Sequence, residues 1–311
     1  MLESLKNFLV HELERKVRLL GNQVGAETKK KAILFTVLAG FLWGTSFPSI
    51  KIGLQYMSPF SFVFLRFLIA FLTMFSIMLV TKNFSFNFSK NRLILLLGII
   101  NGAAYLLQYI GMVNTLAFAS SLFVNLSVVW VALLSPVAIK EPLGGKKVAG
   151  VLLSLVGVLF MTTNLDFESF GTVDVIGNLL VISAGILWAI FIIYNKPLVE
   201  ETNNLIQSMT WILFFTLIPL LPIATFSMET VFALSWTAWI TIIYTAILCW
   251  VVPYYFWLKG LKNISPVTSS IVLLTEIIVA VVVSTIFLGE ILTVVSGIGA
   301  VFIIIAILLV S

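Results

Sequence analysis

The chain is a succession of long apolar runs separated by short polar stretches. Most runs contain about 18–25 residues, which is the length an α-helix needs to cross a hydrocarbon core of about 30 Å. Strands of a membrane barrel would instead alternate polar and apolar residues over about 10 positions. The pattern therefore predicts ten membrane-spanning helices, at 32–53, 59–80, 92–113, 116–139, 147–163, 174–195, 205–225, 235–258, 265–288 and 291–310.

Composition supports an all-α integral membrane protein and limits its chemistry. Hydrophobic residues make up 60% of the 311 positions and charged residues only 10%, against about 25% charged residues in soluble domains. Cys249 and His11 are the only residues of their kinds, which argues against a zinc or haem site and against a Cys/His nucleophile. The sequence contains no Gly-x-x-x-x-Gly-Lys loop, the phosphate-binding motif that would indicate an ATP-driven pump. We expect no enzyme activity, no catalytic residues, no cofactor, no metal and no nucleic-acid partner.

Residues 1–31 differ from the rest of the chain. Apolar residues recur there at spacings of three and four, with basic residues between them, as in an amphipathic helix. Such a helix could lie on the anionic cytoplasmic leaflet. The alternative is a loosely ordered leader that adds positive charge, since Glu3, Glu12 and Glu14 dilute the basic face.

The polar loops predict how the chain is oriented. If the N-terminus is cytoplasmic, all of the 18 lysines and arginines except Lys51 and Arg66 fall on the cytoplasmic side or in the leader. So uneven a distribution is typical of the positive-inside rule. We therefore expect a multi-pass protein of the cell membrane with both termini in the cytoplasm.

The sequence also repeats itself. AGFLW at 39–43 returns as AGILW at 184–188, and Tyr105, Gly111 and Asn114 have counterparts further along the chain in Tyr254, Gly260 and Asn263. The chain is thus divided into a first five-helix repeat, 32–163, and a second, 174–310. Because five is odd, the second repeat must insert upside down, and inverted repeats are the architecture of many secondary transporters.

Several stretches together resemble a known family. AGFLWGTSFPSIKIG, SFVFLRFLIAF, the run from YLLQYIGM to LLSPVAIKEPL, and YYFWLKGLKNISPVTSSIVLLTEIIVA are similar to the EamA-type exporters of the drug/metabolite transporter superfamily. The resemblance covers about residues 32–310 and implies ten helices in two inverted repeats that transport amino acids or other small organic metabolites. One departure is TEIIVA at 275–280, where the family commonly has a proline after the glutamate. The sequence therefore does not decide whether the ninth predicted span, 265–288, is broken at this point.

Two ionisable residues lie well inside predicted spans. Glu276, near the bilayer centre, could bind a proton or a substrate amine, or it could be a neutral acid that holds neighbouring helices together. Arg66 could meet a substrate carboxylate, or it could clamp backbone carbonyls. For Arg66 the structural alternative is favoured, because the family pattern places an arginine here in exporters of different substrates.

Aromatic and amide side chains are the candidates for substrate contact. Aromatic walls with a few polar groups suit small organic molecules that have an apolar part. The alternative for any single one of these side chains is contact with lipid or with the membrane interface. That alternative is favoured for Trp250 and for Asn101 when each is considered alone. The predicted substrate-binding set is Trp43, Tyr105, Gln108, Asn125, Trp188 and Tyr254.

Two functions from different classes remain. The first is a secondary transporter that exports small organic metabolites by alternating access, with a small-molecule substrate and the lipid bilayer as partners. The second is a membrane scaffold or lipid-handling protein, in which the N-terminal helix contacts a partner or an anionic lipid surface and nothing soluble is transported. An intramembrane enzyme is disfavoured because no suitable groups converge.

Overall fold

The protein is a bundle of helices in the part of the chain that the structure describes. The computed structural model describes residues 25–82, 92–113, 123–163, 165, 175–202, 204–227, 234–289 and 292–311, and its first helix occupies residues 25–44. The later helices are α2 (Ser46–Gly53), α3 (Pro59–Val80), α4 (Arg92–Val113), α6 (Ser127–Ala138), α7 (Gly145–Thr163), α8 (Val175–Glu201), α9 (Leu205–Ser227), α10 (Trp236–Ala246), the π-helical turn η3 (Ile247–Val251), α11 (Val252–Leu261), α12 (Pro266–Leu273), α13 (Thr275–Leu288) and α14 (Val294–Val310).

Eight helical segments in the described residues are long and apolar enough to cross a membrane. Two further apolar helices, Phe123–Ala138 and Val294–Val310, occupy the places of the fourth and tenth predicted spans and are shorter. Ten helical segments therefore follow one another in the predicted order. The amphipathic helix predicted for the leader lies mostly outside the described residues, which begin at 25.

Two predicted spans extend further than their apolar runs. The first helix begins at Gly25 rather than at 32, and α8 continues to Glu201 rather than ending at 195. Both extensions contain an ion pair between residues four apart, Glu27 with Lys31 and Lys196 with Glu200, each at 3.1 Å. Such pairs stabilise helical turns at the polar ends, where hydropathy alone gives no signal.

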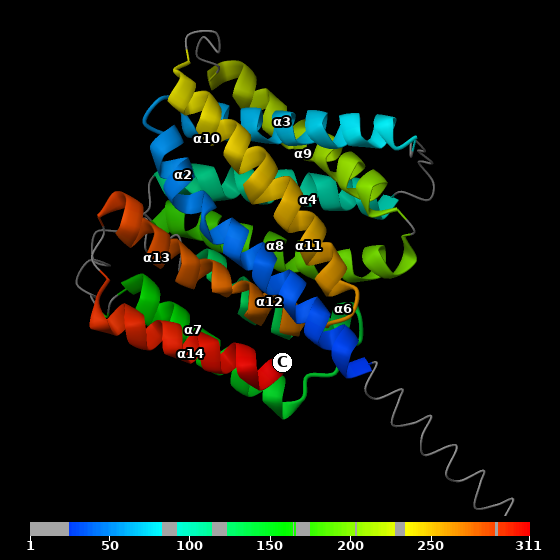
Figure 1. The fold of residues 1–311 in the computed structure, drawn as a ribbon, viewed down its shortest axis with the longest axis vertical. Helices are drawn as coiled ribbons and strands as arrows, with labels where there is room; N and C mark the ends of the chain where they lie inside the picture. Colours follow the sequence, from blue (N-terminus) through cyan, green and yellow to red (C-terminus); the bar gives the residue numbers. More distant parts are fainter. Residues whose placement is uncertain are drawn as a thin grey trace, which may run out of the picture.

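Helices at the same position in the two halves of the chain pack together. α3 contacts α9, the helix pair α6 and α12 is in contact, and α7 contacts α14; these are the second with the seventh span, the fourth with the ninth and the fifth with the tenth. Figure 1 shows α7 and α14 side by side at one edge of the bundle and α3 beside α9 at the other. The two halves are thus interleaved rather than separate.

Three helical segments are interrupted by a single tight turn. The first span turns at Thr45, the fourth at Leu126 and the ninth at Leu274, each with ψ between −12° and −10°. At Leu274 the backbone N–H donates to Ile271 O, three residues back rather than four, which is a 3₁₀ turn. The ninth span is therefore interrupted without the proline that the sequence lacks, and Glu276 lies in the first turn of α13.

The first helix lies very close to this interruption. A Cβ atom at Gly44 would come within 2.6 Å of Glu276 O, so only glycine permits the observed separation of the two backbones. Close approach through small residues is a common mode of helix contact in membranes. The contact places two interrupted spans, one from each half of the chain, against each other.

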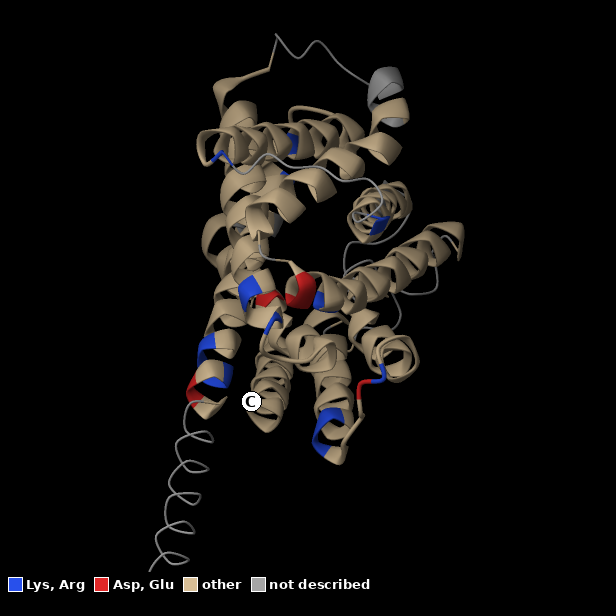
Figure 2. Cartoon of the chain, turned by 90° about the vertical axis from the view of Figure 1, so that its right-hand side faces the viewer, with Lys and Arg blue, Asp and Glu red and all other residues tan. Residues whose placement is uncertain are grey.

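One end of the bundle is rich in lysine and arginine. Figure 2 views this end, which is the right-hand side of Figure 1, and shows basic residues on several helix ends. The Lys29 ammonium donates to Val310 O at 3.3 Å, so the first helix begins where the last one ends. We refer to this end as the basic face.

Gly299 on α14 tests the tight packing between α7 and α14. A Cβ at Gly299 would lie 2.7 Å from Gly157 O, whereas nothing lies within 4 Å of a Cβ at Gly297 on the same helix. We expect Gly299→Ala to destabilise the protein by about 1–3 kcal/mol through overpacking. Gly297→Ala should be neutral or slightly stabilising, because alanine favours a helix. The measurement is the apparent melting temperature in detergent; equal effects of the two substitutions would contradict the close contact.

Candidate functional site

A closed ring of aromatic side chains lies inside the bundle. The rings contact one another in the order Tyr105, Trp188, Phe191, Tyr254, Trp250 and Phe67, and Phe67 contacts Tyr105 again. Centroid distances around the ring run from 4.6 to 5.9 Å, the range in which aromatic pairs attract. Trp257 packs on both Phe191 and Tyr254, and Trp43 packs on Trp257 at 6.1 Å. We call these eight residues the aromatic cluster.

Helical spacing explains why the cluster forms. Trp250, Tyr254 and Trp257 follow one another at four and three residues along η3 and α11, so they project from one face. Trp188 and Phe191 are three residues apart on α8. The cluster also receives Trp43 from the first helix, Phe67 from α3 and Tyr105 from α4. Five spans from both halves of the chain therefore contribute to it.

Two buried hydrogen bonds fix the orientation of the cluster. The Tyr254 hydroxyl, on a side chain that is 1% exposed, donates to Asn195 Oδ1 at 2.8 Å, and the Asn195 amide donates to Phe191 O. The Trp257 indole N–H donates to Ser269 Oγ on α12, also at 2.8 Å. These bonds connect α11 to α8 and to α12. A buried hydroxyl or amide without a partner would be costly, so the bonds select one packing of the rings.

The Arg66 guanidinium binds backbone carbonyls beside the π-helical turn. Arg66 is 2% exposed; its Nε donates to Thr245 O at 3.2 Å and one terminal nitrogen donates to Cys249 O at 3.1 Å. A π-helical turn displaces the usual helical hydrogen bonds, and an arginine fork can bind two acceptors at once. The guanidinium also lies 5.7 and 5.8 Å from the ring centroids of Phe67 and Tyr105. This contact is the one expected of the structural alternative for Arg66.

Glu276 is close to the cluster but has no direct partner. Its carboxylate interacts electrostatically with Arg66 and with Tyr105. Among the described residues, however, it accepts no hydrogen bond and forms no ion pair. The two Arg66 hydrogen bonds described above go to carbonyls and not to Glu276.

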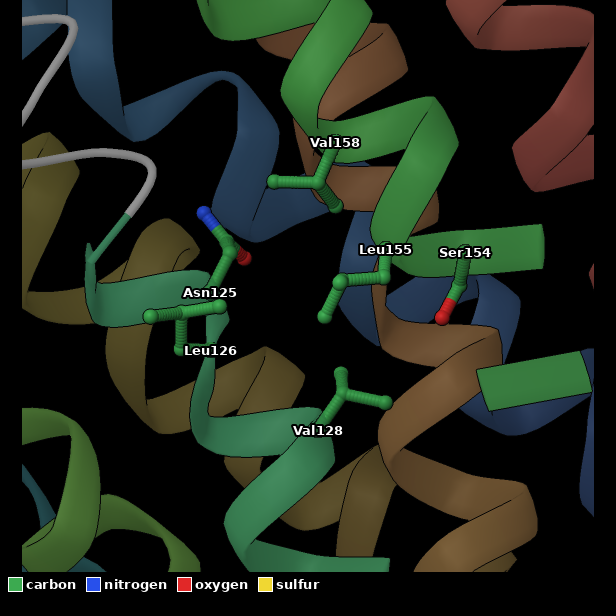
Figure 3. A pocket seen from close by; sticks show the side chains of 6 residues that line it. All are labelled: Asn125, Leu126, Val128, Ser154, Leu155 and Val158. Atoms are coloured by element: carbon green, nitrogen blue, oxygen red, sulfur yellow. The ribbon is translucent and has the colours of Figure 1, made fainter. Parts of the chain in front are cut away.

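The other predicted substrate contacts are less uniform. Trp43, Tyr105 and Trp188 are half-buried in the cluster, whereas Tyr254 is fully buried. Gln108 is half-buried on α4, one turn beyond Tyr105, and its amide makes no hydrogen bond to a described residue. Asn125 lines a small cavity of about 10 Å³ between its own segment and α7 (Figure 3). The residues around this cavity are Asn125, Leu126, Val128, Ser154, Leu155 and Val158.

Two side chains for which lipid contact was favoured are buried instead. Trp250 is 2% exposed and packs in the aromatic cluster, and Asn101 is 0% exposed and donates to Thr216 Oγ1 at 3.0 Å. The prediction was wrong because a helix that is apolar on all sides gives no sign of which face meets lipid.

Sequence reasoning also missed Phe67, Phe191, Trp257 and Asn195. Trp257 could have been found, since it continues the helical spacing of Trp250 and Tyr254. Asn195 likewise lies one turn beyond Phe191 on the same helix. No local signal in the sequence distinguishes Phe67 from the many other phenylalanines of α3.

Tyr254→Phe should reveal the importance of the buried hydroxyl. The substitution leaves Asn195 Oδ1 without its donor in a buried site, and we expect a loss of about 1–3 kcal/mol in the free energy of unfolding. Tyr255→Phe is the control, because the Tyr255 hydroxyl makes no hydrogen bond to a described residue. A comparison of apparent melting temperatures in detergent tests the prediction, and an unchanged Tyr254→Phe protein would argue against it.

Arg66→Lys distinguishes a structural arginine from a substrate contact. Lysine keeps the charge but lacks the planar fork that binds two carbonyls, so we expect a loss of about 2 kcal/mol in stability. Arg92→Lys, at an exposed helix end, should have no effect. Melting temperature and the yield of monodisperse protein are the measurements. A stable Arg66→Lys protein with altered substrate affinity would instead favour the substrate role.

Comparisons with known proteins agree with this architecture. A solved crystal structure superposes with a TM-score of 0.75 at 15% sequence identity, covering 90% of this chain and 96% of that one, which shows the fold alone. An uncharacterized transporter of Archaeoglobus fulgidus is 29% identical over 98% of this chain and 94% of its own. A second one from the same organism is 30% identical over 75% of this chain and 81% of its own.

A third relative has a more specific name. A probable amino-acid metabolite efflux pump of Escherichia coli is 27% identical, with 74% of this chain and 77% of that protein covered. The model of the EamA-like transporter family matches the chain twice, at residues 30–163 and 175–311. The chain therefore belongs to the EamA-like transporter family and is a membrane transporter rather than an enzyme.

Proposed function

We propose that the protein is a secondary transporter that exports small organic metabolites, amino acids or related amphipathic compounds, by alternating access. The observation that carries this proposal is the contact between equivalent helices of the two family-matched halves: α3 with α9, α6 with α12 and α7 with α14. Helices related by a two-fold axis meet in this way. Two inverted five-helix repeats, 32–163 and 174–310, can then rock about a site between them.

The chemistry near the centre supports an organic substrate with an apolar part. Ring faces of the aromatic cluster offer stacking and cation–π contacts, and Glu276 offers a carboxylate that forms no ion pair with a described residue. Three rings of the cluster are only half-buried, so a substrate could displace water from them on binding. They are Trp43, Tyr105 and Trp188. The name of the Escherichia coli relative agrees with amino acids or their derivatives as the substrate class.

The basic face supports the orientation. Basic residues at the ends of several helices gather there (Figure 2), and the contact between Lys29 and Val310 O places the start of the first helix beside the end of α14. The positive-inside rule assigns such a face to the cytoplasm. Export then means uptake at the basic face and release at the opposite one.

Counterflow in proteoliposomes tests the function directly. Purified protein is reconstituted with a panel of amino acids, amines and nucleobases inside, and entry of labelled substrate is followed with and without an imposed pH gradient. We expect saturable counterflow of at least one amino acid or amine. Protein-free liposomes are the control, and the absence of saturable flux for the whole panel would exclude transport of this substrate class and favour a scaffold or lipid-handling protein.

Glu276→Gln tests proton coupling in the same assay. Glutamine keeps the size and removes the titrating group, so we expect stimulation by a pH gradient to be lost while the protein stays folded. Glu27→Gln, at an exposed ion pair near the start of the first helix, should retain the stimulation. Normal transport by Glu276→Gln with an unchanged pH profile would exclude a proton-binding role for Glu276.

A further inference from the structure

A second site of suitable size lies at the basic face, away from the aromatic cluster. A cleft of about 450 Å³ opens between the end of α6, the end of α8 and the beginning of α12, a volume within the range of small-molecule sites. Four charged side chains line it, two lysines and two glutamates, together with prolines and the residue that caps α12. Its lining is Ile139, Lys140, Glu141, Pro142, Lys196, Pro197, Glu200, Ser265 and Pro266.

Glu141 contributes a buried carboxylate to this cleft. Its side chain is only 5% exposed, and Oε1 accepts a hydrogen bond from the Lys147 ammonium at 2.8 Å. The second oxygen, Oε2, is buried and has no hydrogen-bond partner. Burying a charged oxygen without a donor costs free energy. A ligand that brings a strong donor to Oε2 would remove that cost.

Lys140 contributes an exposed cation to the cleft. It is exposed at the cleft and makes no ion pair with a described residue, and its backbone has a φ of 57°. A left-handed conformation is unfavourable for lysine and is often found at functional sites. Lys196, by contrast, donates to Leu261 O and Lys262 O and pairs with Glu200. Lys140 is therefore the lysine of the cleft that can bind an anion without breaking an existing bond.

We propose that this cleft is a recognition site for a small zwitterion of the α-amino-acid type, with the ligand ammonium at Glu141 Oε2 and its carboxylate at Lys140. One free acceptor and one free cation on adjacent residues match the two charges that such a molecule carries on adjacent groups. The proposal rests on the proposed transport function and extends it. The cleft takes up the substrate at the basic face before it reaches the interior.

The position of the cleft relates it to the moving parts of the bundle. Its walls belong to the fourth, sixth and ninth helical segments, and two of these carry the interruptions at Leu126 and Leu274. α8 also carries Trp188 and Phe191 of the aromatic cluster. A zwitterion bound between the helix ends would therefore contact elements that extend to the centre of the bundle.

The test measures equilibrium binding and counterflow on the full chain in lipid nanodiscs and proteoliposomes. Each of the common L-amino acids is tested, and any that binds is compared with its methyl ester, which lacks the carboxylate, and its N-acetyl derivative, which lacks the ammonium. We expect the zwitterion to bind at least about tenfold more tightly than either derivative, as expected for the loss of one charged hydrogen bond. Equal binding of the ester or the N-acetyl derivative would overturn the proposal.

Variants assign the two contacts. Glu141→Gln and Lys140→Asn should each weaken zwitterion binding about tenfold or more, and asparagine is chosen because it tolerates the left-handed conformation. Glu141→Gln should bind the N-acetyl derivative as the wild type does, and Lys140→Asn should do so for the methyl ester. Lys147→Gln removes the ion pair to Glu141 but keeps the carboxylate, so its affinity should be retained or increased. Lys146→Gln, an exposed lysine outside the cleft, is the matched control.

The outcomes separate this proposal from the proposed function. Saturable counterflow of an amino acid with affinity unchanged in Glu141→Gln and Lys140→Asn would overturn the cleft and leave the transport function standing. Counterflow of amines or nucleobases without any amino-acid binding would also overturn the zwitterion site alone. Absence of flux and binding for the entire panel would overturn both.

Discussion

The contact of Arg66 with the backbone of the eighth span is the interaction on which the interior of the bundle depends. A guanidinium inside a membrane must find acceptors within the protein, and a π-helical turn must find donors for displaced carbonyls. Each satisfies the other through Thr245 O and Cys249 O. The two hydrogen bonds fix α3 against α10 and η3, and thereby set where Phe67 meets Trp250 and Tyr105. Among the described residues, Glu276 interacts with Arg66 electrostatically and not through an ion pair.

Around this contact the interior combines rigid and adjustable parts. The aromatic cluster is fixed by the bonds of Tyr254 to Asn195 and of Trp257 to Ser269, so its rings form a well-defined surface. The interruptions at Thr45, Leu126 and Leu274 lie in the first, fourth and ninth spans. The turn at Leu274 is of the 3₁₀ type, which has poorer hydrogen-bond geometry than an α-helix, so a change in helix direction is easier there. Gly44 holds two of these spans in contact next to Glu276.

The charged groups at the basic face have different partners. Lys29 and Lys196 bind the carbonyls at the ends of neighbouring helices, which completes the hydrogen bonding of helix C-termini and favours cations there. Glu141 and Lys140 keep capacity to bind another molecule. The difference follows from backbone geometry. Lys196 and Lys29 extend from helices toward the end of a neighbouring helix. Lys140 lies between α6 and α7, and its backbone has the left-handed conformation.

The sequence by itself determined the class of the protein, the order of ten helical segments, the concentration of lysine at one end and the membership of Tyr105, Trp188 and Tyr254 in one interior group. Hydropathy and helical length carry the first of these because they depend on neighbouring residues only, and the repeated AG-x-LW segments show that the two halves correspond. The tertiary structure alone decided that Trp250 and Asn101 face inward, that Arg66 binds carbonyls and that the ninth span is interrupted without proline. These features depend on which helices meet, and in uniformly apolar helices no local pattern distinguishes the face that meets another helix from the face that meets lipid.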